Sequence, residues 1–175
     1  MKAAELSQIL DGCRELAIMM TPPTSLDQPR MHDDHAEVEV LTCMWNGAWP
    51  APAVDPDDFY DMFHRDIAEV LTCAHAIHIN PTIGLLVRGL RHLGVRGPHL
   101  ETTVECMLEC SPSTMRPDQA ASIVRSLAWR RRLVRQLDRL RVVLTSSTAT
   151  DAEIEGGLDK FVDMGAQQPA SETAA

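Results

Sequence analysis

Aromatic side chains are scarce in this sequence of 175 residues, at 4% of the chain, although 45% of its residues are hydrophobic. A core of this composition is built mostly from leucine, valine, isoleucine, methionine and alanine, which favours helices over a sheet. No apolar run approaches the roughly 20 residues that a membrane-spanning helix needs. The N-terminus also lacks the uninterrupted apolar segment of a signal peptide. We therefore expect a cytoplasmic, all-α protein with one domain and flexible ends.

A disulfide framework is also missing. The five cysteines, an odd number, are scattered mostly over apolar helix positions, which is typical of reduced, buried thiols in the cytosol. Two small groups combine cysteine with histidine, but zinc sites usually have two closely spaced pairs of ligands, and neither group has a second pair. An enzyme such as a metal hydrolase therefore has very little support, and we expect no catalytic residue, cofactor or metal ion. The two groups are Cys73, His75 and His78, and Cys106, Cys110 and His99.

The net charge of −9 argues against a protein that coats nucleic acid over its whole surface. The charge is uneven, however. Residues 118–144 carry seven arginines against two aspartates, a local balance of +5 that leaves −14 for the remainder. This polarity favours docking onto a charged partner or onto a second copy of the chain. Direct DNA binding through the arginine-rich helix 125–141 is the alternative hypothesis.

Apolar residues recur at helical spacing through most of the chain, and no stretch alternates with a period of two. We expect an N-terminal extension helix and linker (1–31), a helical domain (32–145), a linker-type helix (146–164) and a disordered tail (165–175). Asn80 is predicted to cap one helix that Gly94 ends, and Gly47 to end another in a left-handed conformation. A capping box at Thr150 and Glu153 begins the last helix. Helices are predicted over 3–20, 34–46, 57–78, 81–94, 98–110, 117–144 and 150–164.

The helix predicted over 57–78 carries the most informative pattern. Its first turn is acidic, which capping and the helix dipole explain without a carboxylate site. The motif Asp58-Phe59-Tyr60, followed by His64-Arg65, resembles a helix of the N-terminal domain of bacterial DnaB-type replicative DNA helicases. The core of this motif is expected at Phe59, Tyr60, Phe63, His64, Ile67 and Leu71.

The resemblance extends over roughly residues 32–164. His32-x-x-x-Ala36-Glu37-x-x-Val40-Leu41 is similar to the family's opening helix, although Thr42 stands where a glycine is usual. Asn80-Pro81-Thr82-Ile83 with Leu90 and Gly94 is similar to its third helix. A later helix matches at Ala120 or Ala121, Ile123-Val124-Arg125, Ala128 and Arg131 or Arg132 with Leu133, but Gln119 or Ala120 replaces the family's tyrosine.

In that family the domain forms head-to-head dimers through a C-terminal helical hairpin, and three dimers build the collar of the hexamer. The collar also contacts primase and, in some members, helicase loaders. The resemblance implies a hairpin over residues 98–144 and a linker helix over 150–164. Candidates for the partner or oligomer interface are Trp129, Arg130, Arg131, Leu133, Val134, Leu137 and Leu140.

The sequence contains no Gly-x-x-x-x-Gly-Lys-Ser/Thr motif, which would supply the backbone cradle and the lysine for nucleotide phosphates. ATPase and helicase activities are therefore excluded for this sequence. We expect a stand-alone, non-catalytic protein-interaction module of DNA replication. It would form a dimer or higher homo-oligomer, or bind a replicative helicase or primase in a primosome.

Overall fold

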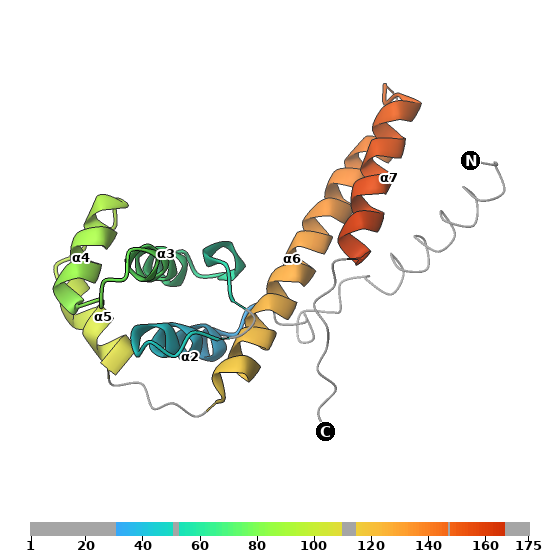
Figure 1. Cartoon of the computed structure of the whole chain (residues 1–175). Coiled ribbons are helices and arrows are strands. Elements are labelled where there is room, and N and C mark those ends of the chain that lie inside the picture. Colours follow the sequence, from blue (N-terminus) through green and yellow to red (C-terminus); the bar gives the residue numbers. More distant parts are fainter. Residues whose placement is uncertain (1–30, 51–52, 110–114, 147, 167–175) are drawn as a thin grey trace, which may run out of the picture. The chain divides into compact units, whose positions relative to one another are not determined.

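The computed structural model describes residues 31–50, 53–109, 115–146 and 148–166 (Figure 1). The chain divides into two units after Arg30, and all described residues belong to the second. The helix predicted over 3–20 and the tail beyond Ala166 lie outside the described residues. Every regular element within them is helical and none is a strand, so the prediction of an all-α fold is confirmed. The elements are α2 (Asp34–Trp45), η1 (Pro56–Asp58, a 3-10 helix), α3 (Met62–Ala76), α4 (Ile83–His92), α5 (Leu100–Glu109), α6 (Pro117–Thr145) and α7 (Asp151–Ala166).

Helix α2 lies at the centre of the fold. It packs against α3, α5 and α6, while α4 packs against α3 and α5. A helix covered on several sides is buried nearly all round, and eight of the twelve residues of α2 are buried. We call α2, η1, α3, α4 and α5 the head. The largest of its fully buried apolar side chains are Leu41, Ile67, Leu71, Leu86, Leu90 and Leu108.

The helix predicted over 57–78 is interrupted. Residues 56–58 form the short η1, the chain is extended at Phe59, and α3 begins only at Met62. Asp61 caps α3 through its carboxylate, which accepts the N–H groups of Phe63 and His64. The prediction of one continuous helix was therefore wrong, because an acidic cap separates two shorter helices.

The predicted cap at Asn80 was also wrong. Helix α4 begins at Ile83, and the hydroxyl of Thr82 accepts the N–H of Leu85 at 3.2 Å. Asn80 and Pro81 precede this cap. The predicted capping box of α7 is present, since the Glu153 carboxylate accepts the N–H and hydroxyl of Thr150, at 2.8 and 2.9 Å. These bonds lower the pKa of Glu153.

Three helices of the head end in the same Schellman motif. Gly47 after α2 and Gly94 after α4 have φ values of +76° and +92°, as the sequence predicts. The N–H of Val95 donates to the carbonyl of Leu90, and the N–H of Gly94 donates to the carbonyl of Arg91. Helix α3 ends in the same way, but a histidine, His78, takes the left-handed position with φ +56°.

The helical hairpin is formed by α6 and α7, and not by residues 98–144. Helices α5 and α6 do not pack against each other, because the apolar face of α5 is covered by α2 and α4. Helix α7 lies alongside α6, its only partner among the described elements (Figure 1). Residues 150–164, expected as a linker helix, are therefore part of the second arm, which continues to Ala166.

Small and apolar residues bring the two arms of the hairpin together. Leu140 of α6 and Leu158 of α7 are 4% and 9% exposed. A Cβ atom on Gly157 would lie 3.0 Å from Cδ1 of Leu140, so glycine permits the close approach. The indole N–H of Trp129 donates to the carbonyl of Met164 at 3.1 Å. Within the described residues, none of the helices has the length and apolar character for a bilayer crossing.

Gly84 lies inside α4 and Gly94 follows its C-terminus. Together they test whether a positive φ requires glycine. Neither Gly84 nor Gly94 has an atom within 4 Å of an added Cβ, but only Gly94 has a positive φ. Gly94→Ala is expected to cost about 1–2 kcal/mol of stability, since alanine is strained in the left-handed region. Gly84→Ala should stabilise by about 0.5–1 kcal/mol, because it lowers the backbone entropy lost on folding. Urea unfolding followed by circular dichroism measures both, and equal effects would contradict this assignment.

Candidate functional site

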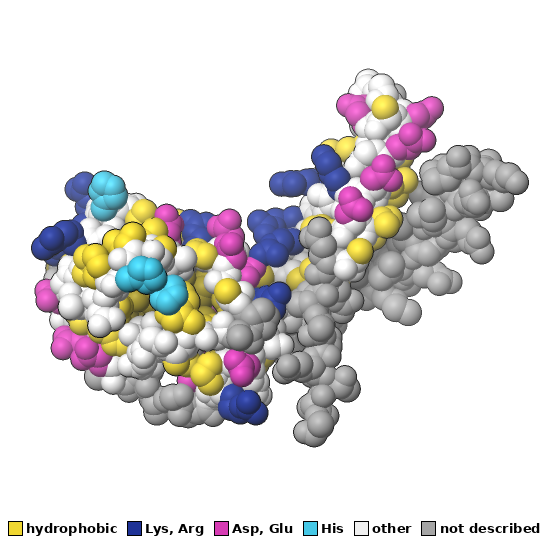
Figure 2. Space-filling model, in the orientation of Figure 1, with side chains coloured by type: hydrophobic (Ala, Val, Ile, Leu, Met, Phe, Trp, Pro, Cys, Tyr) yellow, Lys and Arg dark blue, Asp and Glu magenta, His cyan; other side chains and the backbone are white. Residues whose placement is uncertain are grey.

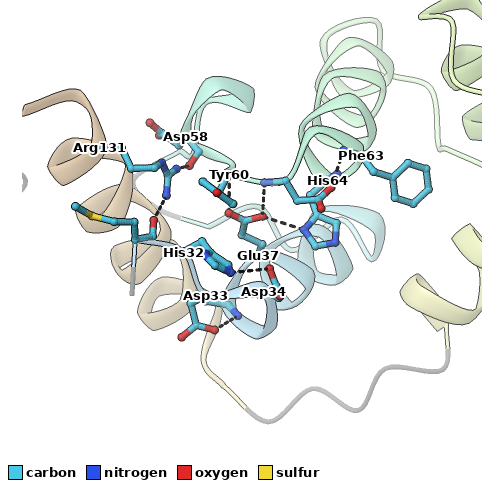
Figure 3. Close-up of polar contacts among 12 residues, drawn as sticks. His32, Asp33, Asp34, Glu37, Asp58, Tyr60, Phe63, His64 and Arg131 are labelled. Atoms are coloured by element: carbon cyan, nitrogen blue, oxygen red, sulfur yellow. Dashed lines mark hydrogen bonds and ion pairs between the residues drawn. The ribbon is translucent and has the colours of Figure 1, made fainter. Parts of the chain in front are cut away.

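The carboxylate of Glu37 is the centre of a buried polar cluster that joins the head to α6 (Figure 3). Glu37 is 1% exposed. Its carboxylate accepts the backbone N–H of Tyr60 at 2.6 Å and that of Asp61 at 3.3 Å. The Nδ1 atom of His64 lies 2.9 Å from the same carboxylate. One side chain of α2 therefore holds the start of α3 in place, across the break that follows η1.

Arg131 attaches α6 to this cluster. Its guanidinium donates to the carbonyl of Met31 at 2.6 Å and to the carbonyl of Asp58. It also lies over the ring of Tyr60, with 5.5 Å from its carbon Cζ to the ring centroid. Burial lowers the pKa of Arg131, while nearby carboxylates act in the opposite sense. An arginine stays protonated under these conditions, so a positive charge lies against the face of the tyrosine ring.

Asp58 makes the second connection between the head and α6. It is 5% exposed, and its carboxylate accepts the N–H of Asp55 at 3.1 Å within the cap of η1. The same carboxylate pairs with Arg132. We call Glu37, Asp58, Tyr60, His64 and Arg131 the joint cluster. Its groups bond to one another or to the backbone, and this arrangement fixes α6 relative to α2 and α3.

The expected core of the motif is placed as follows. Phe59, Ile67 and Leu71 are buried, and Phe63 packs against the core while partly exposed. His64 is partly buried in the joint cluster. Tyr60, which belongs to the motif, is 53% exposed. Its ring stacks on His32 at 4.5 Å between centroids, next to Arg131.

The expected interface residues do not form one surface. Trp129 and Leu140 are engaged by α7, and Arg131 belongs to the joint cluster. Arg130 is exposed, whereas Leu133, Val134 and Leu137 are partly exposed. The residues that sequence reasoning missed are apolar side chains exposed on the hairpin. They are Val142 at 69%, Leu144 at 42% and Val162 at 65%.

The two arms of the hairpin carry opposite charges. Helix α6 has seven arginines against two aspartates, and α7 has five carboxylates against one lysine. Figure 2 shows basic side chains on α6 and acidic ones on α7. Among the ion pairs of the described residues, none joins an arginine of α6 to a carboxylate of α7. Most of these charges therefore face outward.

A groove of about 700 Å³ follows the junction between the head and α6. Four arginines line it, and among the described residues of its lining Asp57 is the one carboxylate. The aromatic rings of Phe59 and Tyr60 supply an apolar wall. Such a groove suits an anionic partner. The arginines are Arg65, Arg131, Arg132 and Arg135.

One member of the two cysteine and histidine groups, Cys110, lies outside the described residues. No group of three or more potential ligands was found among the described residues. Cys73 and Cys106 are exposed rather than buried, and neither is in a disulfide. Cys43 is buried, and burial raises the pKa of its thiol.

Comparison with known proteins found no matching family model, curated protein or solved structure. The resemblance to the DnaB-type collar domain therefore rests on the motif residues of the sequence alone.

Removal of the Glu37 carboxylate should destabilise the whole domain. Glu37→Ala is expected to cost about 3–5 kcal/mol, because buried donors lose their acceptor. Glu37→Gln should cost about 1–3 kcal/mol, since the amide oxygen still accepts. The matched control is Glu69→Ala, an exposed glutamate of α3, for which we expect less than about 0.5 kcal/mol. A loss below about 1 kcal/mol for Glu37→Ala, measured by urea unfolding, would contradict its structural role.

Proposed function

We propose that this chain provides a non-catalytic, cytoplasmic protein-interaction domain of DNA replication, similar to the collar domain of DnaB-type helicases. It self-associates through its hairpin and binds a replicative helicase or a primase. The joint cluster carries this proposal. Glu37, Tyr60, His64 and Arg131 come from three separate motifs of the resemblance, and they meet at one place. Unrelated matches along a sequence would have no physical reason to converge.

The hairpin supports self-association. Helix α6 has 29 residues, a length of about 43 Å. Three large apolar side chains are exposed on the arms, where a partner would cover them. Opposite charges on α6 and α7 allow two copies to pair about a two-fold axis, with the basic arm of each against the acidic arm of the other.

Light scattering over a dilution series tests this step. We expect a dimer or a larger oligomer that dissociates on dilution. Val142→Glu and Val162→Glu should shift the equilibrium towards monomer, because each places a charge on the proposed interface. The control is Met62→Glu, at a residue of the head that is 68% exposed. A wild-type chain that stays monomeric at high concentration would refute self-association.

Partner binding is tested by repeating the measurement with the replicative helicase and the primase of the same organism. A complex with either protein at a fixed stoichiometry is the expected result. If neither protein binds, the assignment to replication fails, even where the chain forms dimers. The hairpin variants tell whether partner binding and self-association use the same surface.

The second candidate function is DNA binding through residues 125–141. The exposed arginines of α6 favour it, among them Arg135 and Arg139. It predicts salt-dependent binding of labelled DNA, with a log–log salt slope that falls by about one for each phosphate-contacting arginine removed. The substitutions to use are Arg135→Ala and Arg139→Ala, since neither residue belongs to the joint cluster. Absence of binding at low salt would exclude this function.

A further inference from the structure

A second groove lies between the C-terminal half of α3 and α4, away from the hairpin. Its volume is about 370 Å³. Helix α4 packs only against α3 and α5 among the described elements, so this groove is separate from α6 and α7. Its lining includes Val70, Ile77, Ile79, Leu85, Arg88 and His92.

The floor of this groove is tightly packed. At Gly89 the two helices are so close that an added Cβ would lie 2.7 Å from Cγ1 of Val70. Ile77 and Ile79 are nevertheless 66% and 47% exposed. Figure 2 shows hydrophobic side chains next to histidines on this face of the head. Exposed isoleucines beside a rigid floor form an apolar surface that no described residue covers.

The turn that presents the two isoleucines has an unusual backbone. His78, between them, takes the left-handed position that glycine fills at the ends of α2 and α4. Its N–H donates to the carbonyl of His75, and that of Ile79 to the carbonyl of Ala74. A side chain in this region costs stability, and such strain is concentrated at sites of function.

The charges of this groove are of one sign. Arg88 and His92 line it, Arg91 lies on the same helix, and α4 contains no carboxylate. Among the described residues that line the groove, none is acidic. The chain as a whole has a net charge of −9, so a basic surface is a local exception. A partner surface that complements this groove would carry an apolar ridge flanked by carboxylates.

We propose that the groove between α3 and α4 binds an acidic amphipathic helix of a partner protein. Apolar side chains of that helix, one turn apart, contact Ile77, Ile79 and Leu85. Its carboxylates pair with Arg88 and accept a hydrogen bond from the His92 imidazole. The surface lies on the head, so it is independent of self-association through the hairpin.

Two synthetic peptides test this inference on the full chain. Both have about 18 residues, long enough for a helix, with leucines at i, i+3, i+4 and i+7. One peptide carries glutamates on either side of the leucines, and the other carries lysines at the same positions. Binding is measured by fluorescence anisotropy, and the site is located by amide chemical shifts. We expect the glutamate peptide to bind about tenfold more tightly or better, with shifts at residues 70–92.

Matched variants locate the interaction. Ile77→Asp should weaken binding of the glutamate peptide about tenfold or more, since one buried isoleucine contributes that much. Met62→Asp is the control. Met62 is 68% exposed and Ile77 is 66% exposed, but Met62 does not line the groove. Arg88→Glu should reverse the preference between the two peptides.

Several outcomes would overturn the inference. Equal binding of both peptides would refute the role of charge, and binding of neither would refute the docking site. An equal loss with Met62→Asp would show a nonspecific effect. Groove resonances that shift with protein concentration alone would assign the groove to a second copy of this chain. Hairpin self-association, measured separately by light scattering, is unaffected by any of these results.

Discussion

The buried carboxylate of Glu37 is the interaction on which the rest of this fold depends. A charge with 1% exposure is stable only when donors surround it, and these donors come from the turn before α3 and from His64. The carboxylate thus sets where α3 begins and how it crosses α2. The phenol ring of Tyr60, held by this turn, then receives Arg131 from α6. Head and hairpin are joined by this network of polar contacts and by the burial of Ala120, Ala121 and Val124 of α6 in the apolar core of the head.

This joint explains how residues that resemble a helicase motif serve a structural purpose here. Their hydrogen-bonding groups point towards one another, leaving the surfaces of the hairpin and of α4 for recognition. The joint cluster holds α6 in one position on the head. The opposite charges of α6 and α7 are therefore held in defined positions relative to the head. A rigid arm lowers the entropy that association must overcome. The proposed interaction function is consistent with this division between a polar joint and outward-facing charges.

The hairpin and the groove between α3 and α4 offer different kinds of surface. On the hairpin, both signs of charge flank exposed valines, which suits pairing between identical copies. At the groove, Arg88 and His92 lie beside exposed isoleucines, and this combination suits a partner of different composition. Under the two proposals, the domain assembles with itself and recruits another protein through separate surfaces.

Much of the local structure could be predicted from the sequence. Apolar spacing placed α2 and α6 to within a residue at each end, and glycine marked the left-handed ends at Gly47 and Gly94. Those features depend on a residue and its near neighbours. The break at 59–61 was missed, because it is stabilised by a carboxylate 23 residues away from Tyr60.

The sequence by itself determined that the chain is helical and where most helices begin and end. Only the tertiary structure decided which helix packs on which. Apolar stripes on α5 and α7 look alike in sequence, yet among the described elements α5 is covered by α2 and α4 while α7 packs on α6 alone. Hydrophobic burial has no direction, so a stripe specifies that a face is covered and not by what. Residues such as Gly157 and Leu140 come into contact only in the folded chain. Which helices pack together therefore depends on how their surfaces fit in three dimensions.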